Sequence, residues 1–262
     1  MQKRVTDEDI KERLDKIGFR IAVMSGKGGV GKSTVTALLA VHYAKQGKKV
    51  GILDADFLGP SIPHLFGLEK GKVAVSDEGL EPVLTQRLGI KVMSIQFLLP
   101  KRETPVIWRG PLIAGMIREF LGRVAWGELD YLLIDLPPGT GDAPLTVMQD
   151  AKPNGAVIVS TPQELTAAVV EKAITMAEQT KTAVLGIVEN MAYFECPNCG
   201  ERTYLFGEGK ASELARKYKI EFITEIPIDS DLLKLSDLGR VEEYEPDWFE
   251  FFPYLEHHHH HH

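Results

Sequence analysis

One glycine-rich segment constrains the fold of this chain more than any other feature. Residues 26–34 read Gly-Lys-Gly-Gly-Val-Gly-Lys-Ser-Thr, and they contain the pattern G-x-x-x-x-G-K-[ST] from Gly26 to Ser33. An apolar run precedes the segment at residues 21–25, and a helical pattern follows it at 32–46. Glycines let several backbone N–H groups point inward, and the helix N-terminus adds its positive end. The segment therefore predicts a phosphate-binding loop between a strand and a helix.

The residue types in this loop indicate a nucleoside triphosphate with magnesium. We expect the Lys32 ammonium to reach the β- and γ-phosphates and the Ser33 hydroxyl to ligate Mg²⁺. The pattern does not require Lys27, which is either an exposed charge or a cation that contacts nucleotide. The predicted nucleotide contacts are Gly26, Lys27, Gly28, Gly29, Val30, Gly31, Lys32, Ser33 and Thr34.

Apolar runs alternate with helical patterns along the chain, which predicts an α/β fold. Several runs are continuous in Val, Ile and Leu, as strands covered on both faces require. We expect a mostly parallel sheet of about seven strands with helices on both faces, the architecture of a P-loop NTPase. The predicted strands are residues 21–25, 50–53, 90–95, 131–134, 156–160, 183–188 and 221–226. The predicted helices are 6–17, ended by Gly18, and 32–46, 112–125, 165–179 and 211–219.

The chain shows no repeat or linker, so we expect one domain over residues 1–254. Its N-terminal helix lies within 1–18, a small hairpin is expected at 72–83, and a polar loop at 190–208 holds both cysteines. Leu255, Glu256 and six histidines are interpreted as an expression tag. Only His42 and His64 then remain, which excludes a catalytic metal site rich in histidine.

The charge and the hydropathy of the chain limit the cellular compartments and the classes of binding partner that we expect. The formal net charge is −7, which gives no overall attraction to nucleic acid. No stretch approaches the ~18–20 apolar residues of a membrane span, and residues 1–16 do not resemble a signal peptide. We therefore expect a cytoplasmic protein that binds neither membrane nor nucleic acid.

Carboxylates follow two of the predicted strands. Asp54 and Asp56 follow residues 50–53, and Asp135 follows 131–134. Ligands bind at the carboxyl ends of strands in open α/β sheets, so these groups are candidates for the nucleotide site. Asp135 is expected to hold Mg²⁺ through a water molecule, whereas Asp54 and Asp142 could simply cap turns.

The two cysteines lie three residues apart, as Cys196-Pro-Asn-Cys199-Gly. In a reducing compartment this spacing favours metal binding or redox chemistry over a structural disulfide. The pattern also has the shape of half a zinc ribbon, and the spacing alone does not separate zinc from iron. A thioredoxin-like pair would need the cysteines at a helix start, whereas these lie in a polar loop.

Lys27 and the complete run Gly-Lys-Gly-Gly-Val-Gly-Lys-Ser-Thr resemble the deviant Walker A motif. That motif marks the family of MinD, ParA, nitrogenase iron protein and Mrp-type ATPases. The resemblance implies that Lys27 reaches the nucleotide of the facing subunit in a homodimer, and that Asp56 orients the attacking water. It also implies that Asp54 lies nearer to Mg²⁺ or Lys32. Asn190 and Pro227 then occupy the adenine side.

Three further motifs are similar to Mrp-type iron–sulfur cluster carriers, and the resemblance runs from about residue 19 to 238. They are residues 54–63, residues 108–111 with the 135–142 motif, and the cysteine pair. The resemblance implies an ATPase that binds a [4Fe–4S] cluster and exchanges it with a cluster-assembly scaffold and apo iron–sulfur proteins. Such a cluster usually needs four thiolates, so Cys196 and Cys199 would pair with those of a second subunit.

Three alternatives stay open at this point. The same four thiolates could hold Zn²⁺ and make a zinc-stapled dimeric ATPase. A ParA/MinD-like positioning switch would need a basic face or an amphipathic C-terminal helix, and the tail at 241–254 is acidic and contains two prolines. A reductase like nitrogenase iron protein would use the same dimer-bridging cluster.

Overall fold

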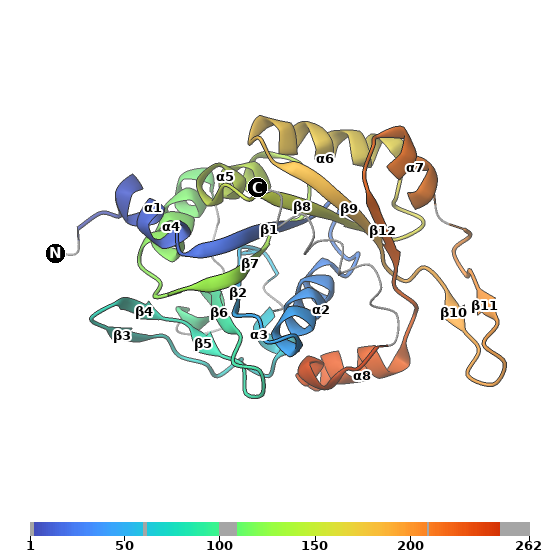
Figure 1. Cartoon of the computed structure of the whole chain (residues 1–262), viewed down its shortest axis with the longest axis horizontal. Helices are drawn as coiled ribbons and strands as arrows, with labels where there is room; N and C mark the ends of the chain where they lie inside the picture. Colours follow the sequence, from blue (N-terminus) through green and yellow to red (C-terminus); the bar gives the residue numbers. More distant parts are fainter. Residues whose placement is uncertain (1–2, 60–61, 100–108, 209, 247–262) are drawn as a thin grey trace.

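The computed structural model describes residues 3–59, 62–99, 109–208 and 210–246, apart from the side chains of Phe222 and Ile223. Pro60, Ser61, Trp108, the tail beyond 246 and the predicted tag lie outside these residues. Figure 1 shows a central sheet with helices above and below it.

The central sheet has eight strands in the order β12-β9-β8-β1-β7-β2-β6-β5. Seven are parallel to their neighbours, and β5 is an antiparallel edge strand on β6, which adds one strand to the predicted set. Their bounds are β1 Ile17–Ser25, β2 Val50–Asp54, β5 Val83–Leu84, β6 Lys91–Ser94, β7 Leu129–Asp135, β8 Gly155–Ser160, β9 Ala183–Glu189 and β12 Phe222–Glu225.

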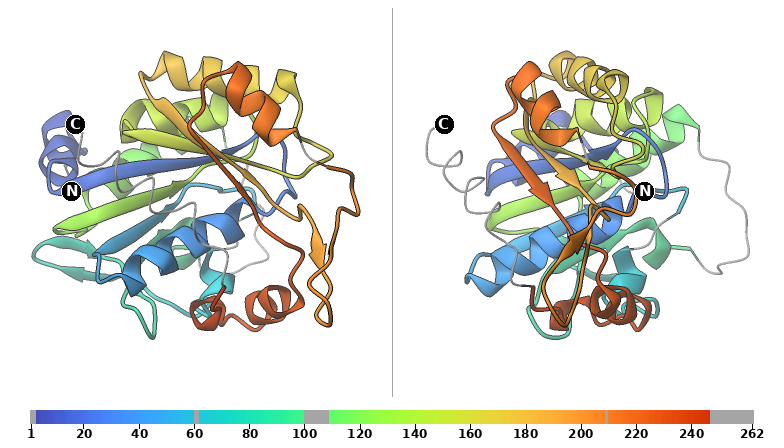
Figure 2. Two further views of the ribbon diagram at one scale, coloured as in Figure 1. Left: turned by 45° about the vertical axis from the view of Figure 1, so that its right-hand side comes forward. Right: turned by 90° about the vertical axis from the view of Figure 1, so that its right-hand side faces the viewer.

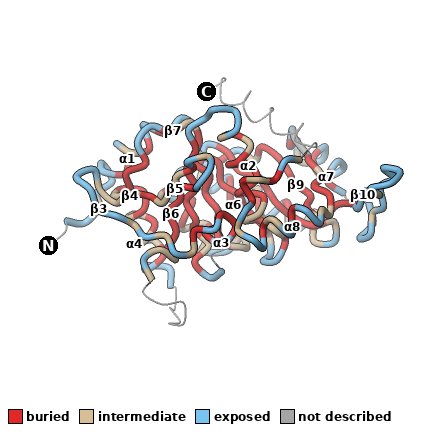
Figure 3. Tube along the Cα trace, turned by 90° about the horizontal axis from the view of Figure 1, so that it is seen from below, coloured by how far each residue is buried: buried red, intermediate tan, exposed pale blue. Residues whose placement is uncertain are grey.

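Two small antiparallel hairpins project from this body. One pairs β3 Ala74–Ser76 with β4 Gly79–Glu81, inside the hairpin predicted at 72–83. The other pairs β10 Phe194–Glu195 with β11 Arg202–Thr203, in the segment predicted as a loop. The hairpin strands are exposed or half-buried, whereas the described residues of the sheet are mostly buried except in the edge strand β5 (Figure 3).

Eight α-helices are described, and they form two layers. None of them, over the described part of the chain, has the length and apolar character needed to cross a membrane. Their bounds are α1 Asp7–Leu14, α2 Lys32–Lys45, α3 Ile62–Leu65, α4 Gly110–Gly122, α5 Asp142–Ala151, α6 Ala167–Gln179, α7 Ala211–Lys217 and α8 Ser230–Asp237, with 3₁₀ turns at Ile95–Phe97 and Val241–Glu243.

Each face of the sheet has its own hydrophobic core. Along β1, Ala22 and Met24 pack with α1, α4, α5, α6 and α7, whereas Ile21 and Val23 pack with α2, α3 and α8. Figures 1 and 2 show these two helical layers on opposite sides of the sheet. Alternate side chains of a strand point to opposite faces, so continuous apolar runs are the sequence that such a sheet requires.

One predicted helix needs correction, and the helices α3, α5 and α8 were not predicted. The N-terminal helix ends at Leu14 instead of continuing to Ile17, because Ile17 already pairs with Leu129 in the sheet. Helix α5 was not predicted, although its apolar positions Val147 and Met148 are fully buried. Helix α8 was also missed, since its sequence is short and polar apart from leucines.

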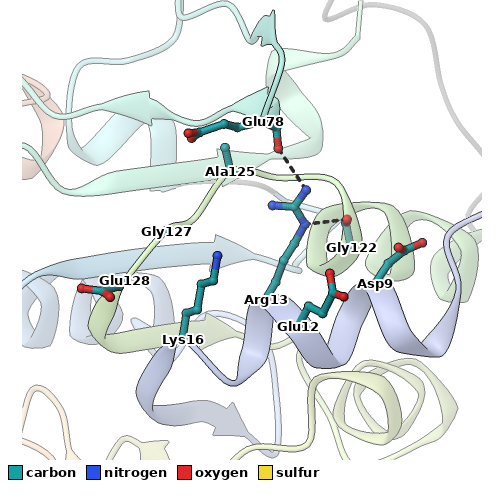
Figure 4. A pocket seen from close by; sticks show the side chains of 9 residues that line it. All are labelled: Asp9, Glu12, Arg13, Lys16, Glu78, Gly122, Ala125, Gly127 and Glu128. Carbon is teal, nitrogen blue, oxygen red and sulfur yellow. Dashed lines mark hydrogen bonds between the residues drawn. The ribbon is translucent and has the colours of Figure 1, made fainter.

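Arg13 attaches the N-terminal helix to the rest of the molecule. Its guanidinium donates to the Gly122 carbonyl at 2.6 Å, and to those of Val124 and Glu78 at 3.0 Å each. A cavity of about 430 Å³ lies beside it, at the N-terminal ends of β1 and β7 (Figure 4). This cavity is at the end of the strands opposite the glycine-rich loop, so Arg13 has a structural role.

We expect Arg13→Ala to lower the free energy of unfolding by about 1–3 kcal/mol, since hydrogen bonds from a charged donor are lost. Each kcal/mol corresponds to a melting temperature lower by roughly 2–4 °C in a domain of this size. Thermal denaturation followed by circular dichroism measures the effect. Lys11→Ala is the matched control, because Lys11 forms an exposed ion pair with Asp15 one turn away on the same helix. Equal melting of the two variants would contradict this role of Arg13.

Candidate functional site

The glycine-rich loop connects β1 to α2 at the centre of the sheet. Gly29 and Gly31 both have positive φ, at 81° and 82°, so the loop needs glycine at these positions. Gly31 is the N-cap of α2, and no side chain caps that helix end. The first backbone N–H groups of α2 are therefore free to donate hydrogen bonds to an anion held in the loop.

A cavity of about 240 Å³ lies over this loop. The loop lines it from one side, and Asp56, Gly59 and Pro138 line it from the other. The side chains of Val169 and Asn190 lie close to two glycines of the loop. A Cβ on Gly26 would lie 2.9 Å from a Val169 methyl, and one on Gly31 would lie 2.2 Å from the Asn190 amide nitrogen. The loop has no room to be rebuilt with larger residues at these two positions.

Asp135, at the end of β7, is the centre of the site. It is fully buried, and Lys32 Nζ lies 2.7 Å from its Oδ1. The Ser33 hydroxyl donates to Oδ2 at 2.7 Å, and the Thr36 hydroxyl donates to Oδ1 at 2.9 Å. The structure thus brings together three of the residues predicted for phosphate and magnesium, and adds Thr36. Thr36 lies one helical turn after Lys32, a spacing that could have identified it.

Asp54 and Asp56 occupy different environments after β2. Asp56 Oδ2 lies 3.8 Å from Lys32 Nζ, and Asp56 lines the cavity. Asp54 is 1% exposed and accepts a hydrogen bond from the Ser94 hydroxyl at 3.0 Å. Among the described residues Asp56, and not Asp54, forms the ion pair with Lys32, which contradicts the Lys32 part of the expectation for Asp54. The expected place of Asp54 near Mg²⁺ stays a prediction. Ser94 ends β6, beside β2, and sequence reasoning overlooked it.

Burial and mutual repulsion disturb the titration of these carboxyl groups. Burial raises the pKa of Asp54 well above its usual range, and the nearby Asp135 charge raises it further. Burial also raises the pKa of Asp56, while the Lys32 ammonium opposes that shift. Three carboxyl groups thus face one ammonium in a buried site. The site can accept additional positive charge.

The Asp135–Asp142 segment runs past the cavity into α5. The Gly139 N–H donates to the Ser25 carbonyl at 2.8 Å, and Gly139 has a φ of 98°. Asp142 lies in the first turn of α5, where its charge favours the helix N-terminus. The capping interpretation of Asp142 is wrong, because Gly141 is the N-cap of α5 and no described side chain makes a capping hydrogen bond there.

Lys27 stands apart from the buried cluster. Its side chain is 69% exposed, and its ammonium lies 3.3 Å from Oε2 of Glu164, which follows β8. An exposed pair of this kind stabilises a protein by about 0–1 kcal/mol at most, so it holds Lys27 weakly. Glu164 was not predicted from the sequence.

Asn190 and Pro227 lie in adjacent segments after β9 and β12. Asn190 is 9% exposed, and its side-chain amide donates to the Val30 carbonyl at 3.0 Å. Pro227 is buried, and its neighbour Ile226 exchanges backbone hydrogen bonds with Glu189 and Ala192. The structure therefore places Asn190 against the glycine-rich loop and Pro227 in the segment paired with it, and the adenine contact of both residues stays a prediction.

The two cysteines lie at the tip of the β10–β11 hairpin. Cys196 is partly exposed and Cys199 is exposed, and both are free thiols. The Cys196 N–H donates to the Glu201 carbonyl and the Gly200 N–H donates to the Cys196 carbonyl, each at 2.9 Å. Gly200 has a φ of 75°, which closes the turn.

Backbone groups at this tip favour a thiolate. N–H groups of Asn198 and Cys199 hydrogen-bond to the Cys196 sulfur and lower the pKa of its thiol. A thiolate is the form of cysteine that binds metals. The turn therefore presents one exposed and one partly exposed cysteine, and its backbone favours the thiolate of Cys196.

Comparison with known proteins relates this chain to iron-transfer P-loop NTPases. The family model described as ParA, NUBPL iron-transfer P-loop NTPase, matches residues 16–250. The chain is 49% identical over 234 residues to the iron-sulfur cluster carrier protein of Methanocaldococcus jannaschii, with 89% of this chain and 80% of that protein covered.

Solved structures agree with that family in fold. A nucleotide-binding protein from Archaeoglobus fulgidus, in complex with ADP and with cobalt found by PIXE, is 95% identical. The match has a TM-score of 0.90 and covers 97% of this chain and 100% of that one. The cell division ATPase MinD of Pyrococcus furiosus is 21% identical, with a TM-score of 0.60 over 90% of this chain and 95% of that one, and supports the fold alone.

The raised pKa of Asp54 predicts how stability depends on pH in nucleotide-free protein. A raised pKa means that the folded state holds the proton more tightly, so this contribution is lost as pH rises through the folded-state pKa. Asp54→Asn, which is always neutral, should therefore melt at a higher temperature than wild type at pH 8. The difference should vanish near pH 4, about the pKa of an unfolded aspartate. Asp77→Asn is the control, because Asp77 is exposed. If Asp54→Asn instead melts below wild type by a margin that grows with pH, the carboxylate form of Asp54 stabilises the fold and this prediction is wrong.

Proposed function

This chain belongs to the ParA family of NUBPL-type iron-transfer P-loop NTPases, and from that premise we propose that it is an ATP-hydrolysing iron–sulfur cluster carrier. It binds a [4Fe–4S] cluster between two subunits and passes it to apo-proteins. The observation that carries the proposal is the pairing of a complete phosphate loop with an exposed two-cysteine turn on one chain. The named carrier relative and the ADP-bound, cobalt-containing structure support it.

Lys32, Ser33, Asp56 and Asp135 form the catalytic machinery of this proposal. Lys32 binds the β- and γ-phosphates when it exchanges Asp135 for phosphate oxygens, and Asp56, at the wall of the cavity, orients the attacking water. The oxygens of Ser33 and Asp135 fit Mg²⁺, which prefers carboxylate, hydroxyl and water ligands. Bound Mg²⁺ supplies charge neutralisation at the phosphates. Asp54 lies opposite Asp135 on the neighbouring strand β2, and in this proposal its carboxylate also helps to hold Mg²⁺.

Two features support a homodimer as the working unit. Lys27 is exposed and weakly held, so its ammonium is available to the nucleotide of a facing subunit. One chain also supplies two thiolates, whereas a four-iron cluster usually needs four. A symmetric pair of chains satisfies both requirements at a single interface.

We extend this proposal to the residues that contact adenine, to the binding partners and to the cellular compartment. Asn190 and Pro227 contact adenine, since both lie along the strand edge beside the loop. The partners are a cluster-assembly scaffold and apo iron–sulfur proteins, with no role for membrane or nucleic acid. Two free thiols fit the cytoplasm, where cysteines stay reduced.

We expect complementation between two inactive variants if Lys27 acts across the interface. Lys27→Ala and Asp56→Ala should each hydrolyse ATP slowly on their own. A mixed dimer has one site with both residues intact, so an equal mixture should recover about one quarter of the wild-type sites under random pairing. The rate of ATP turnover, measured as a function of the mixing ratio, tests this. A mixture of Lys32→Ala and Asp56→Ala is the control and should recover no activity, because both residues act on the nucleotide of their own subunit. Absence of recovery, despite mixed dimers detected by mass spectrometry, would rule out the cross-subunit lysine.

The cysteine turn predicts the metal content. After anaerobic reconstitution with iron and sulfide, the protein should contain about two irons per chain, as one four-iron cluster per dimer. Cys196→Ala and Cys199→Ala should each lose the iron and the visible absorption but still bind ADP, because the turn and the phosphate loop are separate. Wild type should activate an apo-acceptor enzyme. One zinc per dimer with no iron–sulfur absorption would leave a zinc-stapled ATPase instead of a carrier.

A further inference from the structure

A short segment of four residues joins the phosphate loop to the cysteine hairpin. It spans 190–193, between the end of β9 at Glu189 and the start of β10 at Phe194. Its first side chain, Asn190, donates to the Val30 carbonyl of the loop at 3.0 Å. Three residues beyond its other end the chain reaches Cys196. Figure 2 shows the hairpin extending from this end of β9.

Hydrogen bonds fix this segment along its length. The Asn190 N–H donates to the Ser160 carbonyl at 2.7 Å, and the Ala192 N–H donates to the Ile226 carbonyl at 2.9 Å. The Ile228 N–H donates to the Tyr193 carbonyl at 2.7 Å. Three backbone hydrogen bonds over four residues leave this segment little freedom to bend, so a displacement at one end should also move the other end. We call residues 190–193 the strut.

Both ends of the strut are closely packed. At the loop end, a single Cβ on Gly31 would lie 2.2 Å from the Asn190 nitrogen, so little free space separates them. At the hairpin end, the buried Tyr193 ring lies beneath the Arg202 guanidinium at 4.3 Å and beside Tyr204. Packed contacts transmit small shifts, because they cannot be compressed.

One residue of the strut has an unfavourable backbone conformation. Met191 has a φ of 56°, in the left-handed region that side chains other than glycine rarely adopt. Its surroundings hold it there, and an over-determined backbone of this kind is common where two elements are coupled.

We propose that Asn190 is a positioning residue that couples nucleotide occupancy of the phosphate loop to the orientation of the Cys196–Cys199 turn. The inference rests on the proposed function for its purpose, since it gives ATP a route to the cluster site. A displacement of Val30 when phosphate binds passes through the Asn190 amide to residues 191–193 and so to the hairpin. An amide has a further N–H and an oxygen, so the same side chain can also contact adenine.

Thiol reactivity tests this coupling without any need for a cluster. The full-length protein, freed of metal by a chelator, is alkylated with iodoacetamide in the absence of nucleotide and with saturating ADP or a non-hydrolysable ATP analogue. For wild type, we expect the alkylation rates with and without nucleotide to differ by about fivefold or more, the lower end of typical couplings between sites. In Asn190→Ala the ratio should fall to near one, with saturation verified by direct nucleotide binding.

Two further variants make the test specific. Asn154→Ala is the matched control, because Asn154 binds the Arg20 N–H at the other end of the sheet, and it should keep the wild-type ratio. Met191→Gly relieves the strained backbone and makes the strut flexible, so it should stay folded and lose most of the ratio. An unchanged ratio in Met191→Gly and Asn190→Ala, or no nucleotide effect in wild type, would overturn the coupling.

The outcome is separable from that of the carrier proposal. If nucleotide alters thiol reactivity through Asn190 but no iron–sulfur cluster forms, the coupling stands and the carrier function fails. If the cluster forms and is transferred while thiol reactivity ignores nucleotide, the coupling fails and the carrier function stands.

Discussion

The buried contact between Lys32 and Asp135 is the interaction on which the rest of the site depends. It joins the phosphate loop and α2 to the end of β7, at a distance of 2.7 Å and with Asp135 fully buried. Burial of two charges is costly, and it is tolerated here because Ser33 and Thr36 donate further hydrogen bonds to the same carboxylate. Removal of one partner would leave a buried charge unpaired, at a cost of about 3–5 kcal/mol.

In the nucleotide-free site, Lys32 and Asp135 occupy each other in a way that phosphate and a cation can replace. Asp54 and Asp56 add acidic groups around a single ammonium, and the pKa of each is raised by burial. Phosphate and a divalent cation together supply new partners for both members of the Lys32–Asp135 pair. The proposed nucleotide binding thus exchanges the partners of Lys32 and Asp135, and Asn190 contacts the loop that carries Lys32.

Sequence reasoning predicted elements well where one local pattern was sufficient. Several of the seven parallel strands are continuous apolar runs, and the phosphate loop has its glycines and lysine at fixed spacing. The helices α5 and α8 were missed, and α1 was made too long, because their limits depend on contacts with the sheet. The pairing of Ile17 with Leu129, which ends the helical region, joins residues more than a hundred positions apart.

The sequence by itself determined the fold class, the phosphate loop and the cysteine pair, since each depends on residues close together in the chain. Only the tertiary structure decided that Asp56, and not Asp54, pairs with Lys32, and that Ser94 holds Asp54. It alone placed the Asn190 amide on the Val30 carbonyl, 160 positions away. Strand order in a parallel sheet is set by the packing of helices on both faces. That packing brings distant residues into contact, and no local pattern encodes which ones will meet.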